Sequence, residues 1–268
     1  MMWWLLGLAL AQTEYVVPED ARRVDAQLFR QSLDALGTLW TNDASVRPHL
    51  YGTARVGMMY MRDPLVFEWV DGHTARLVRD AAALNVAGTL QLSRVRLGLE
   101  LPVYLFAVGD EGGKGTAGLG PALVDVKGTI LDPARTGVGL ALAARVALPT
   151  QTMQIPLGRG TIYEVEAILN GVVGGFVVAA NLGHRGVPRV ELADQSWDDQ
   201  LLMRAGFGYR FGEEGGVSLD LVSSTVYGQM FGRFVTPVET MVGGWARLNR
   251  RLVLRAGVGA GLTDAIGS

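Results

Sequence analysis

Hydrophobic and polar residues alternate along most of the chain, most clearly from Ala122 to Leu148. Because successive side chains of a strand point to opposite faces, this pattern predicts two strands joined by a turn at 132–137. Their apolar faces are Ala122, Val124, Val126, Gly128 and Ile130, then Val138, Leu140, Leu142, Ala144, Val146 and Leu148. Each run is about eleven residues long, whereas soluble strands average about 5–6 and tilted membrane-spanning strands need about 9–11. Long strands with one unbroken apolar face are typical of a transmembrane β-barrel.

The same alternation predicts eleven strands in all, beginning near Leu50 and ending near Leu262. Their ranges are 50–60, 84–91, 95–105, 122–130, 138–148, 163–170, 176–183, 203–211, 217–221, 238–247 and 252–262. The ten connections alternate between long and short, starting with a long one at 61–79. Outer-membrane barrels have long extracellular loops and short periplasmic turns, so we expect the long set outside and the N-terminus in the periplasm.

These strands predict an all-β fold, a transmembrane antiparallel up-and-down β-barrel that occupies residues 50–268. In such a sheet the first and eleventh strands run the same way and cannot close as an antiparallel pair, and bacterial single-chain barrels have even strand numbers. We therefore expect about twelve strands, eleven of them present, in a sequence truncated at its C-terminus. A soluble sandwich or lipocalin-like barrel is disfavoured, because its water-facing side would be rich in glycine, a poor strand former.

Aromatic residues fall at both ends of the predicted outward faces, as the interfacial girdles of a membrane barrel require. At the long-loop ends these are Tyr60, Tyr163 and Tyr227, and at the short-turn ends Phe176, Tyr209 and Phe211.

The first 49 residues lie outside this pattern. Residues 1–11 are apolar and end in Ala9-Leu10-Ala11, which predicts a cleaved signal peptide, although no basic residue precedes it. Residues 12–49 are predicted to form a periplasmic or lumenal segment with a short amphipathic helix at 24–36. Such a segment can plug the barrel, lie at its periplasmic rim or remain loose.

Composition agrees with a closed sheet in a membrane. Charged residues make up 19% of the chain and 36 residues are glycine, against about 25% charged and 7% glycine in average proteins. The net charge of −2 does not favour nucleic acid as a partner. Cysteine is absent, which excludes disulfides and thiolate chemistry.

None of the candidate catalytic or binding motifs lies in the surroundings that its chemistry requires. Residues 113–118 spell G-x-G-x-x-G, but they lie in a predicted loop and open no helix, so a dinucleotide site is not expected. His49, His73 and His184 lack the surroundings of a nucleophile or a metalloprotease site. Asp194, Asp198 and Asp199 lack EF-hand spacing. We predict no enzyme activity, no cofactor and no metal.

The informative polar residues are those on the inward faces. Charges beside a low-dielectric wall are costly unless paired, so they should form either a salt-bridge lattice that fills the lumen or a lining that selects solutes. The predicted lumen-lining residues are Arg94, Arg96, Glu100, Asp125, Lys127, Arg145, Glu164, Glu166, Arg204, Arg210, Asp220, Glu239, Arg247 and Arg255.

Several short stretches carry a resemblance: residues 25–30 (DAQLFR), 63–66 (DPLV), 98–103 (GLELPV), 126–132 (VKGTILD), 179–183 (AANLG) and 257–263 (GVGAGLT). In these the chain resembles the N-terminal barrel of OmpA-family outer-membrane proteins of the myxobacterial (deltaproteobacterial) type. The resemblance implies an outer-membrane location. In complete relatives it also implies a last strand often followed by acidic calcium-binding repeats and a peptidoglycan-binding domain. The sequence shows no such tail, so peptidoglycan anchoring is not carried over.

The sequence thus predicts a bacterial outer-membrane protein that is a structural barrel or a narrow passive pore, with the lipid bilayer and possible small solutes or ions as partners. A substrate-selective transporter is the alternative, and an outer-membrane enzyme is less favoured. The pattern leaves the oligomeric state open.

Overall fold

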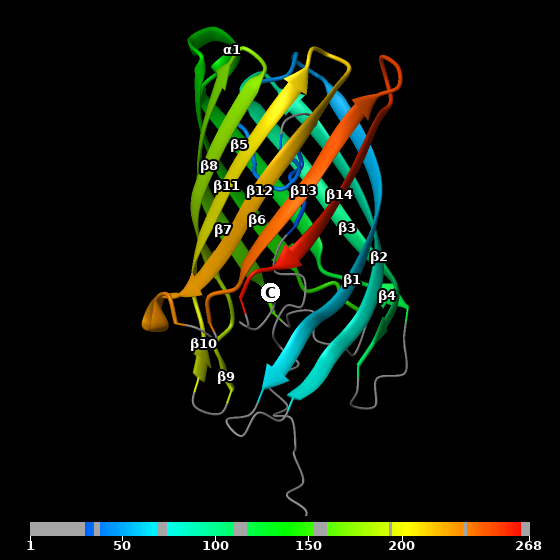
Figure 1. Cartoon of the computed structure of the whole chain (residues 1–268), viewed down its shortest axis with the longest axis vertical. Coiled ribbons are helices and arrows are strands. Elements are labelled where there is room, and N and C mark those ends of the chain that lie inside the picture. Colours follow the sequence, from blue (N-terminus) through cyan, green and yellow to red (C-terminus); the bar gives the residue numbers. More distant parts are fainter. Residues whose placement is uncertain are drawn as a thin grey trace, which may run out of the picture.

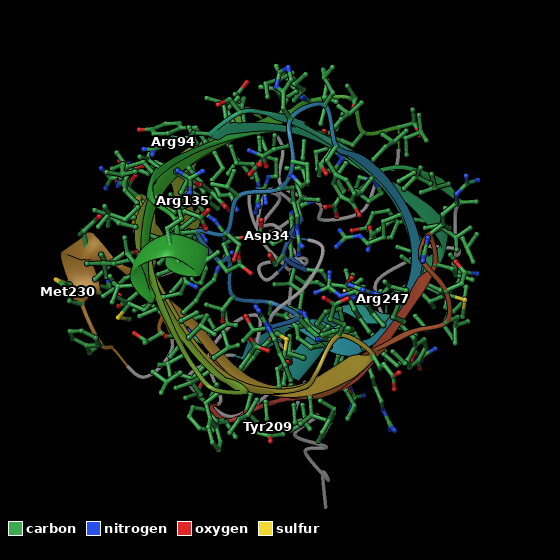
Figure 2. The ribbon with its side chains drawn as sticks, turned by 90° about the horizontal axis from the view of Figure 1, so that it is seen from above. Asp34, Arg94, Arg135, Tyr209, Met230 and Arg247 are labelled. Carbon is green, nitrogen blue, oxygen red and sulfur yellow. The ribbon has the colours of Figure 1, made fainter. Side chains whose placement is uncertain are left out.

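The computed structural model describes residues 30–34, 38–68, 74–109, 117–152, 160–192, 195–232 and 235–263. The predicted signal peptide lies outside these residues, as do His73, Asp194 and most of the glycine-rich motif at 113–118. Within them, eleven strands follow one another in sequence order, each antiparallel to the next, and the sheet curls into a barrel (Figures 1 and 2). The predicted all-β up-and-down fold is confirmed.

The main strands match the eleven predicted runs, and most are longer. They are β1 (Gly52–Glu68), β2 (Thr74–Leu92), β3 (Val95–Val108), β5 (Ala122–Leu131), β6 (Val138–Leu148), β7 (Ile162–Val173), β8 (Phe176–Gly186), β11 (Gln200–Phe211), β12 (Gly215–Val226), β13 (Val238–Arg247) and β14 (Val253–Gly261). The minor elements are β4 (Gly118–Leu119), which pairs with β3, the β9 (Val190–Leu192) and β10 (Gln195–Trp197) hairpin, α1 (Pro133–Thr136) and the 3₁₀ turn η2 (Tyr227–Gln229). No helix in the described residues is long and apolar enough to cross a membrane.

The β5–β6 hairpin shows how local sequence sets the register. Its turn contains α1, whose first N–H groups are capped by the Asp132 side chain, which accepts from the Ala134 amide, and whose end is Gly137 at φ 76°. A left-handed residue at this position favours glycine. The turn aligns Asp125 with Arg145, so opposite charges face each other on the inner side.

The polarity of the two faces is that of a membrane barrel. The outward residue Leu142 is 53% exposed, while Arg145, three positions further along the same strand and therefore on the opposite face, is 6% exposed and lies inside. A soluble barrel would bury Leu142 and expose Arg145, so the structure excludes that alternative for the described strands.

Aromatic side chains cluster at both rims of the outer surface. At the short-turn rim the ring of Tyr209 lies 4.9 Å from that of Phe176 and 5.2 Å from that of Phe211. At the long-loop rim His184 lies between Tyr163 and Tyr227, with ring centroids 5.5 and 5.6 Å away. These pairs occupy the heights expected of two aromatic girdles.

Two predictions of local structure are wrong. The segment 61–79 is not a long loop, because β1 continues to Glu68 and β2 begins at Thr74, so the two strands project beyond the others (Figure 1). The helix expected at 24–36 is absent from its described part, residues 30–34, which is irregular. Tertiary hydrogen bonds to the barrel, described below, replace helical ones there.

The sheet has two ends, β1 and β14, which do not pair with each other in the described residues. With ten antiparallel steps between them, both strands run from the short-turn end to the long-loop end (Figure 1). The predicted parity of the first and last strands is therefore confirmed.

Candidate functional site: a lumen filled by the N-terminal segment

The barrel encloses most of the described residues that precede β1. Residues 30–34 and 38–45, here called the lumen segment, lie inside the ring of strands, with Asp34 near its centre (Figure 2). Thr41, Asn42 and Ala44 are almost completely buried. Of the three placements that the sequence allowed, plug, rim or loose chain, the structure shows the plug.

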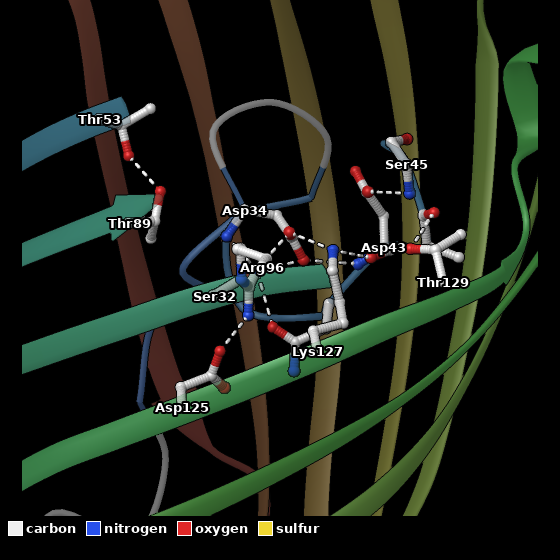
Figure 3. Close-up of polar contacts among 12 residues, drawn as sticks. Ser32, Asp34, Asp43, Ser45, Thr53, Thr89, Arg96, Asp125, Lys127 and Thr129 are labelled. Atoms are coloured by element: carbon white, nitrogen blue, oxygen red, sulfur yellow. Dashed lines mark hydrogen bonds and ion pairs between the residues drawn. The ribbon is translucent and has the colours of Figure 1, made fainter. Parts of the chain in front are cut away.

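Asp34 is the principal contact between the lumen segment and the barrel. Its Oδ1 accepts hydrogen bonds from Arg96 of β3 and Lys127 of β5, and all three side chains are at most 9% exposed (Figure 3). Arg96 also bonds Asp125 at 2.5 Å, and Lys127 donates to the Asp43 carbonyl at 2.6 Å. Burial alone raises the pKa of Asp34, but the Arg96 and Lys127 cations hold it well below its usual range. Asp34 is therefore a carboxylate at neutral pH.

A second carboxylate, Asp220 of β12, holds the segment from the opposite side. Asp220 accepts from the Thr41 backbone N–H at 2.9 Å and from the Thr41 hydroxyl at 2.6 Å. The Leu39 N–H also donates to it, at 3.3 Å. These bonds satisfy backbone groups that an irregular buried segment would otherwise leave unpaired, which is costly.

Side-chain amides and a hydroxyl complete the attachment. Asn42 N–H donates to Asn181 of β8 at 2.8 Å, and Asn42 Nδ2 donates to Glu166 of β7 at 2.6 Å. Ala44 donates to Asn170 of β7 at 3.1 Å and accepts from Thr129 of β5 at 3.0 Å. Strands from most of the barrel therefore form hydrogen bonds with this one short segment.

The inner surface has glycines where the lumen segment comes closest. A Cβ at Gly206 would lie 2.8 Å from both Thr38 Cγ2 and Thr41 Oγ1, and one at Gly139 would lie 2.9 Å from the Ala44 Cβ. These inward glycines leave room in the lumen, and the lumen segment occupies that room.

We expect Gly206→Ala to reduce stability by about 1–3 kcal/mol, the range of an overpacked core, since its methyl group would press on Thr38 and Thr41. Gly128→Ala is the matched control, because a Cβ there meets nothing within 4 Å on the outer surface. Urea unfolding in lipid vesicles measures both. Equal midpoints for the two variants would contradict a tightly filled lumen.

Between the plug and the long-loop end, the barrel side chains form a lattice of their own. Arg145 lies 3.4 Å from both Asp125 and Glu164, and Glu164 also contacts Arg185 at 2.7 Å and Arg204 at 3.7 Å. Of the two sequence hypotheses for these charges, lattice or solute-selective lining, the observed pairing corresponds to the lattice.

Apolar residues pack inside the barrel toward the long-loop end. Leu39 and Trp40 of the lumen segment join a buried cluster with residues of β1, β2, β3, β12 and β13 and of the β9–β10 hairpin. Its hairpin members are Val190 and Trp197, at 2% and 3% exposure. The lumen segment and this apolar cluster, which share Leu39 and Trp40, together fill the described part of the lumen.

Most predicted lumen residues lie where the parity placed them, and one does not. Arg96, Glu100, Asp125, Lys127, Arg145, Glu164, Glu166, Arg204 and Asp220 are buried, and Arg210, Glu239, Arg247 and Arg255 are half-buried. Arg94 instead lies exposed in the β2–β3 turn and donates to the Ile130 carbonyl at 3.1 Å. The prediction treated Arg94 as an inward residue of β3, but β3 begins only at Val95, so Arg94 belongs to the turn before it.

The sequence analysis missed the lumen segment's own contribution. Asp34, Thr41 and Asn42 bond residues of β3, β5, β7, β8 and β12, but nothing periodic marks them in the sequence. Two barrel residues, Arg55 and Arg185, do carry the inward parity, and that signal could have found them: Arg55 lies 3.3 Å from Glu100, and Arg185 bonds Glu164.

The described residues include no group of three or more His, Asp or Glu side chains arranged to hold a metal ion. The small lumenal space nearest the short-turn rim, lined by Asp34, Asp43, Tyr51 and Gln91 among others, has room for about one or two water molecules.

Comparisons with known proteins point to the same class of fold. The chain matches no protein-family model, and it matches no curated protein. Among solved structures it is similar to the crystal structure of an outer membrane channel from Pseudomonas putida F1, with a TM-score of 0.60 and 15% sequence identity. The match covers 82% of this chain and 91% of the other. The molecule thus has the barrel fold of an outer membrane channel.

Proposed function

We propose that this protein is an outer-membrane β-barrel of the channel type whose pore is held closed by its own N-terminal segment. The single observation that carries this proposal is the lumen segment, which is bonded to β3, β5, β7, β8 and β12 across the inside of the ring. The similar outer membrane channel supports the class of protein. The resemblance to OmpA-family barrels stays a prediction.

The outer surface supports a location in a lipid bilayer. The exposed side chains of the strands are apolar between two aromatic rims, and ionised residues lie inside. In water this apolar belt would be exposed to solvent over most of the barrel, which is unfavourable. In a bilayer the lipid hydrocarbon contacts the belt and removes that cost.

We expect Leu142→Arg to weaken folding into lipid vesicles by about 2–4 kcal/mol, the cost of a lipid-facing arginine near the bilayer midplane. Glu213→Arg, in an exposed turn, is the control and should fold like the wild type. Folding is followed by heat-modifiable gel mobility. Equal yields of both variants would rule out a lipid-covered belt at Leu142.

The nature of the plug argues for a gate and against a permanent core. In its described part, only Leu33, Leu39 and Trp40 add large buried apolar side chains. Many of its contacts to the barrel are hydrogen bonds and ion pairs, such as Asp34 with Arg96 and Thr41 with Asp220. Water can replace such partners when the segment leaves, whereas an apolar core loses its burial energy outright.

Conductance across planar bilayers tests the gate. We expect few or no steps from the wild type and ohmic steps from the double variant Asp34→Asn/Asp220→Asn, which removes two of the carboxylates that join the segment to the barrel. A Cys pair at Ala44 and Ala141, which pack together, supplies the control in a chain with no native cysteine. Oxidation should silence the double variant and reductant should restore its steps.

Two results separate the alternatives. Steps of equal size and frequency from wild type and double variant would show that the segment does not gate conduction. No steps from either, with the released segment open to protease, would identify a structural barrel, the second function that the sequence favoured. Absence of enzyme activity remains a prediction.

A further inference from the structure

The outer surface of the barrel is hollowed where β3, β5, β6 and β7 lie side by side. A groove of about 470 Å³ crosses these strands, a volume within the range of about 300–1,000 Å³ that ligand pockets occupy. It starts beside Arg94 in the β2–β3 turn and reaches Val165, in the half of β7 nearer the long loops. Three strand spacings of about 4.8 Å separate β3 from β7, so the groove is about 14 Å long.

Two small outward residues account for the hollow. Gly128 of β5 lies opposite Leu142 of β6, and a Cβ at Gly128 would meet no atom within 4 Å. Ala144 of β6 lies between Val126 of β5 and Val165 of β7. The glycine and the alanine therefore form a floor, and their larger apolar neighbours form the walls on either side.

Among the residues that line the groove, Arg94 alone is charged. Its Nη1 donates to the Ile130 carbonyl at 3.1 Å, and its own carbonyl accepts from the Thr129 N–H at 2.9 Å. The register of β5 shifts at this point, between Thr129 and Leu131. These bonds hold the guanidinium over the end of β5. A guanidinium has five N–H donors, and Arg94 has no carboxylate partner in the described part of the chain, so donors remain for a ligand at the rim.

An apolar groove with a cation at one end matches the chemistry of a phospholipid. The walls suit an acyl chain, and arginine binds phosphate oxygens through charge-assisted hydrogen bonds. Arg94 lies at the short-turn rim, on the same side of the barrel as Arg135 of α1 (Figure 2). The aromatic rings of this rim, Phe176, Tyr209 and Phe211, come from β8 and β11 instead. Positive charge and apolar surface therefore meet in this sector of the barrel.

We propose that the groove is a binding site for one phospholipid of the leaflet that meets the short-turn end. One acyl chain lies over Gly128 and Ala144, and the phosphate accepts hydrogen bonds from Arg94. The site rests on the proposed membrane location, because only a bilayer brings a lipid to this face with its phosphate at the rim.

Native mass spectrometry of the full chain, refolded in detergent and titrated with phosphatidylglycerol, tests the site. We expect the first lipid to bind more tightly than any later one. Arg94→Gln should weaken this first binding about fivefold, the effect of one basic residue beside an anionic lipid, and Ala144→Leu should weaken it at least as much by filling the floor. The matched controls are Arg251→Gln, in an exposed turn at the same rim, and Ala205→Leu, an exposed alanine of β11. Both should bind like the wild type.

Two further ligands separate the parts of the lipid. Diacylglycerol, which has the chains but no phosphate, should bind the wild type about as weakly as phosphatidylglycerol binds Arg94→Gln. Glycerol phosphate, which has no chains, should not displace the bound lipid. Displacement by glycerol phosphate would show a simple anion site at Arg94 and would overturn the proposal.

Photocrosslinking in vesicles gives a second readout, with a phosphatidylglycerol that carries a photoreactive group midway along one chain. Crosslinks should concentrate on the peptides that contain Leu142 and Val165, and Ala144→Leu should abolish this preference. Crosslinks spread evenly around the barrel, or equal lipid binding by Ala144→Leu and Ala205→Leu, would overturn the proposal.

Heat-modifiable gel mobility separates failure of the site from failure of the proposed function. A wild-type chain that does not fold into vesicles would contradict the membrane location and the lipid site together. A folded barrel without a preferred lipid would contradict the site alone. Conductance plays no part in either measurement, so the proposed gate is tested independently.

Discussion

Replacing Asp34 by asparagine is expected to lower the free energy of unfolding by about 3 kcal/mol or more and to loosen the lumen segment. The change removes a buried charge and leaves the Lys127 ammonium and part of the Arg96 guanidinium without their counter-charge, and breaking one partner of a buried ion pair costs about 3–5 kcal/mol. Urea unfolding in vesicles measures the stability, and limited trypsin cleavage at Arg30 measures release of the segment.

The matched control is Asp63→Asn, which removes the same charge from a half-exposed ion pair with Arg76 at 2.9 Å. Exposed pairs contribute about 0–1 kcal/mol, so the control should unfold like the wild type. If both variants lose the same small amount, Asp34 does not anchor the segment. If Asp34→Asn loses stability while Arg30 stays protected, the other contacts, led by Asp220, suffice to hold the plug.

The second large effect is expected from replacing Glu164, whose carboxylate joins several arginines in the salt-bridge lattice of the barrel. Its carboxylate contacts Arg145, Arg185 and Arg204, at 3.4, 2.7 and 3.7 Å. Glu164→Gln leaves three buried guanidinium groups with less counter-charge, and we expect a loss of about 3–5 kcal/mol. Arg145 keeps Asp125 and Arg204 keeps Glu166, so the loss should not exceed this range.

Glu164 differs from Asp34 in position, since its carboxylate contacts guanidinium groups of the strands β6, β8 and β11, whereas Asp34 belongs to the lumen segment itself. Molecules of Glu164→Gln that remain folded should therefore keep Arg30 protected from trypsin, unlike those of Asp34→Asn. Glu213→Gln is the control, because its contact with Arg247 at 3.0 Å lies at an 89% exposed side chain. Equal stability of Glu164→Gln and Glu213→Gln would show that the lattice is not a major source of stability.

The barrel could be predicted from sequence because its physical signal is local. A strand with lipid outside and charge inside must alternate at every second residue, as β6 does from Val138 to Leu148, and the alternation needs no knowledge of distant parts. The extensions of β1 and β2 were missed because the stretch from Met61 to Arg79 carries a bulge between Arg62 and Leu65, which breaks the two-residue period.

The plug could not be predicted in the same way. Its conformation is set by partners such as Asn181 and Asp220, which lie about 140 and 180 residues further along the chain. Only the polar run Thr41-Asn42-Asp43 marked the segment, and such runs occur equally in solvated linkers. The predicted helix failed for the same reason, since side chains of the barrel supply the hydrogen bonds that a helix would have made internally.

The threading of the lumen segment also constrains the order of assembly. Thr38 and Leu39 reach Arg255 across more than 210 positions of sequence, and contacts of such separation form slowly because the intervening chain must first be brought together. These bonds can therefore form only after the strands between their partners have been brought together, and the attachment of the lumen segment to β14 belongs to the late stages of folding.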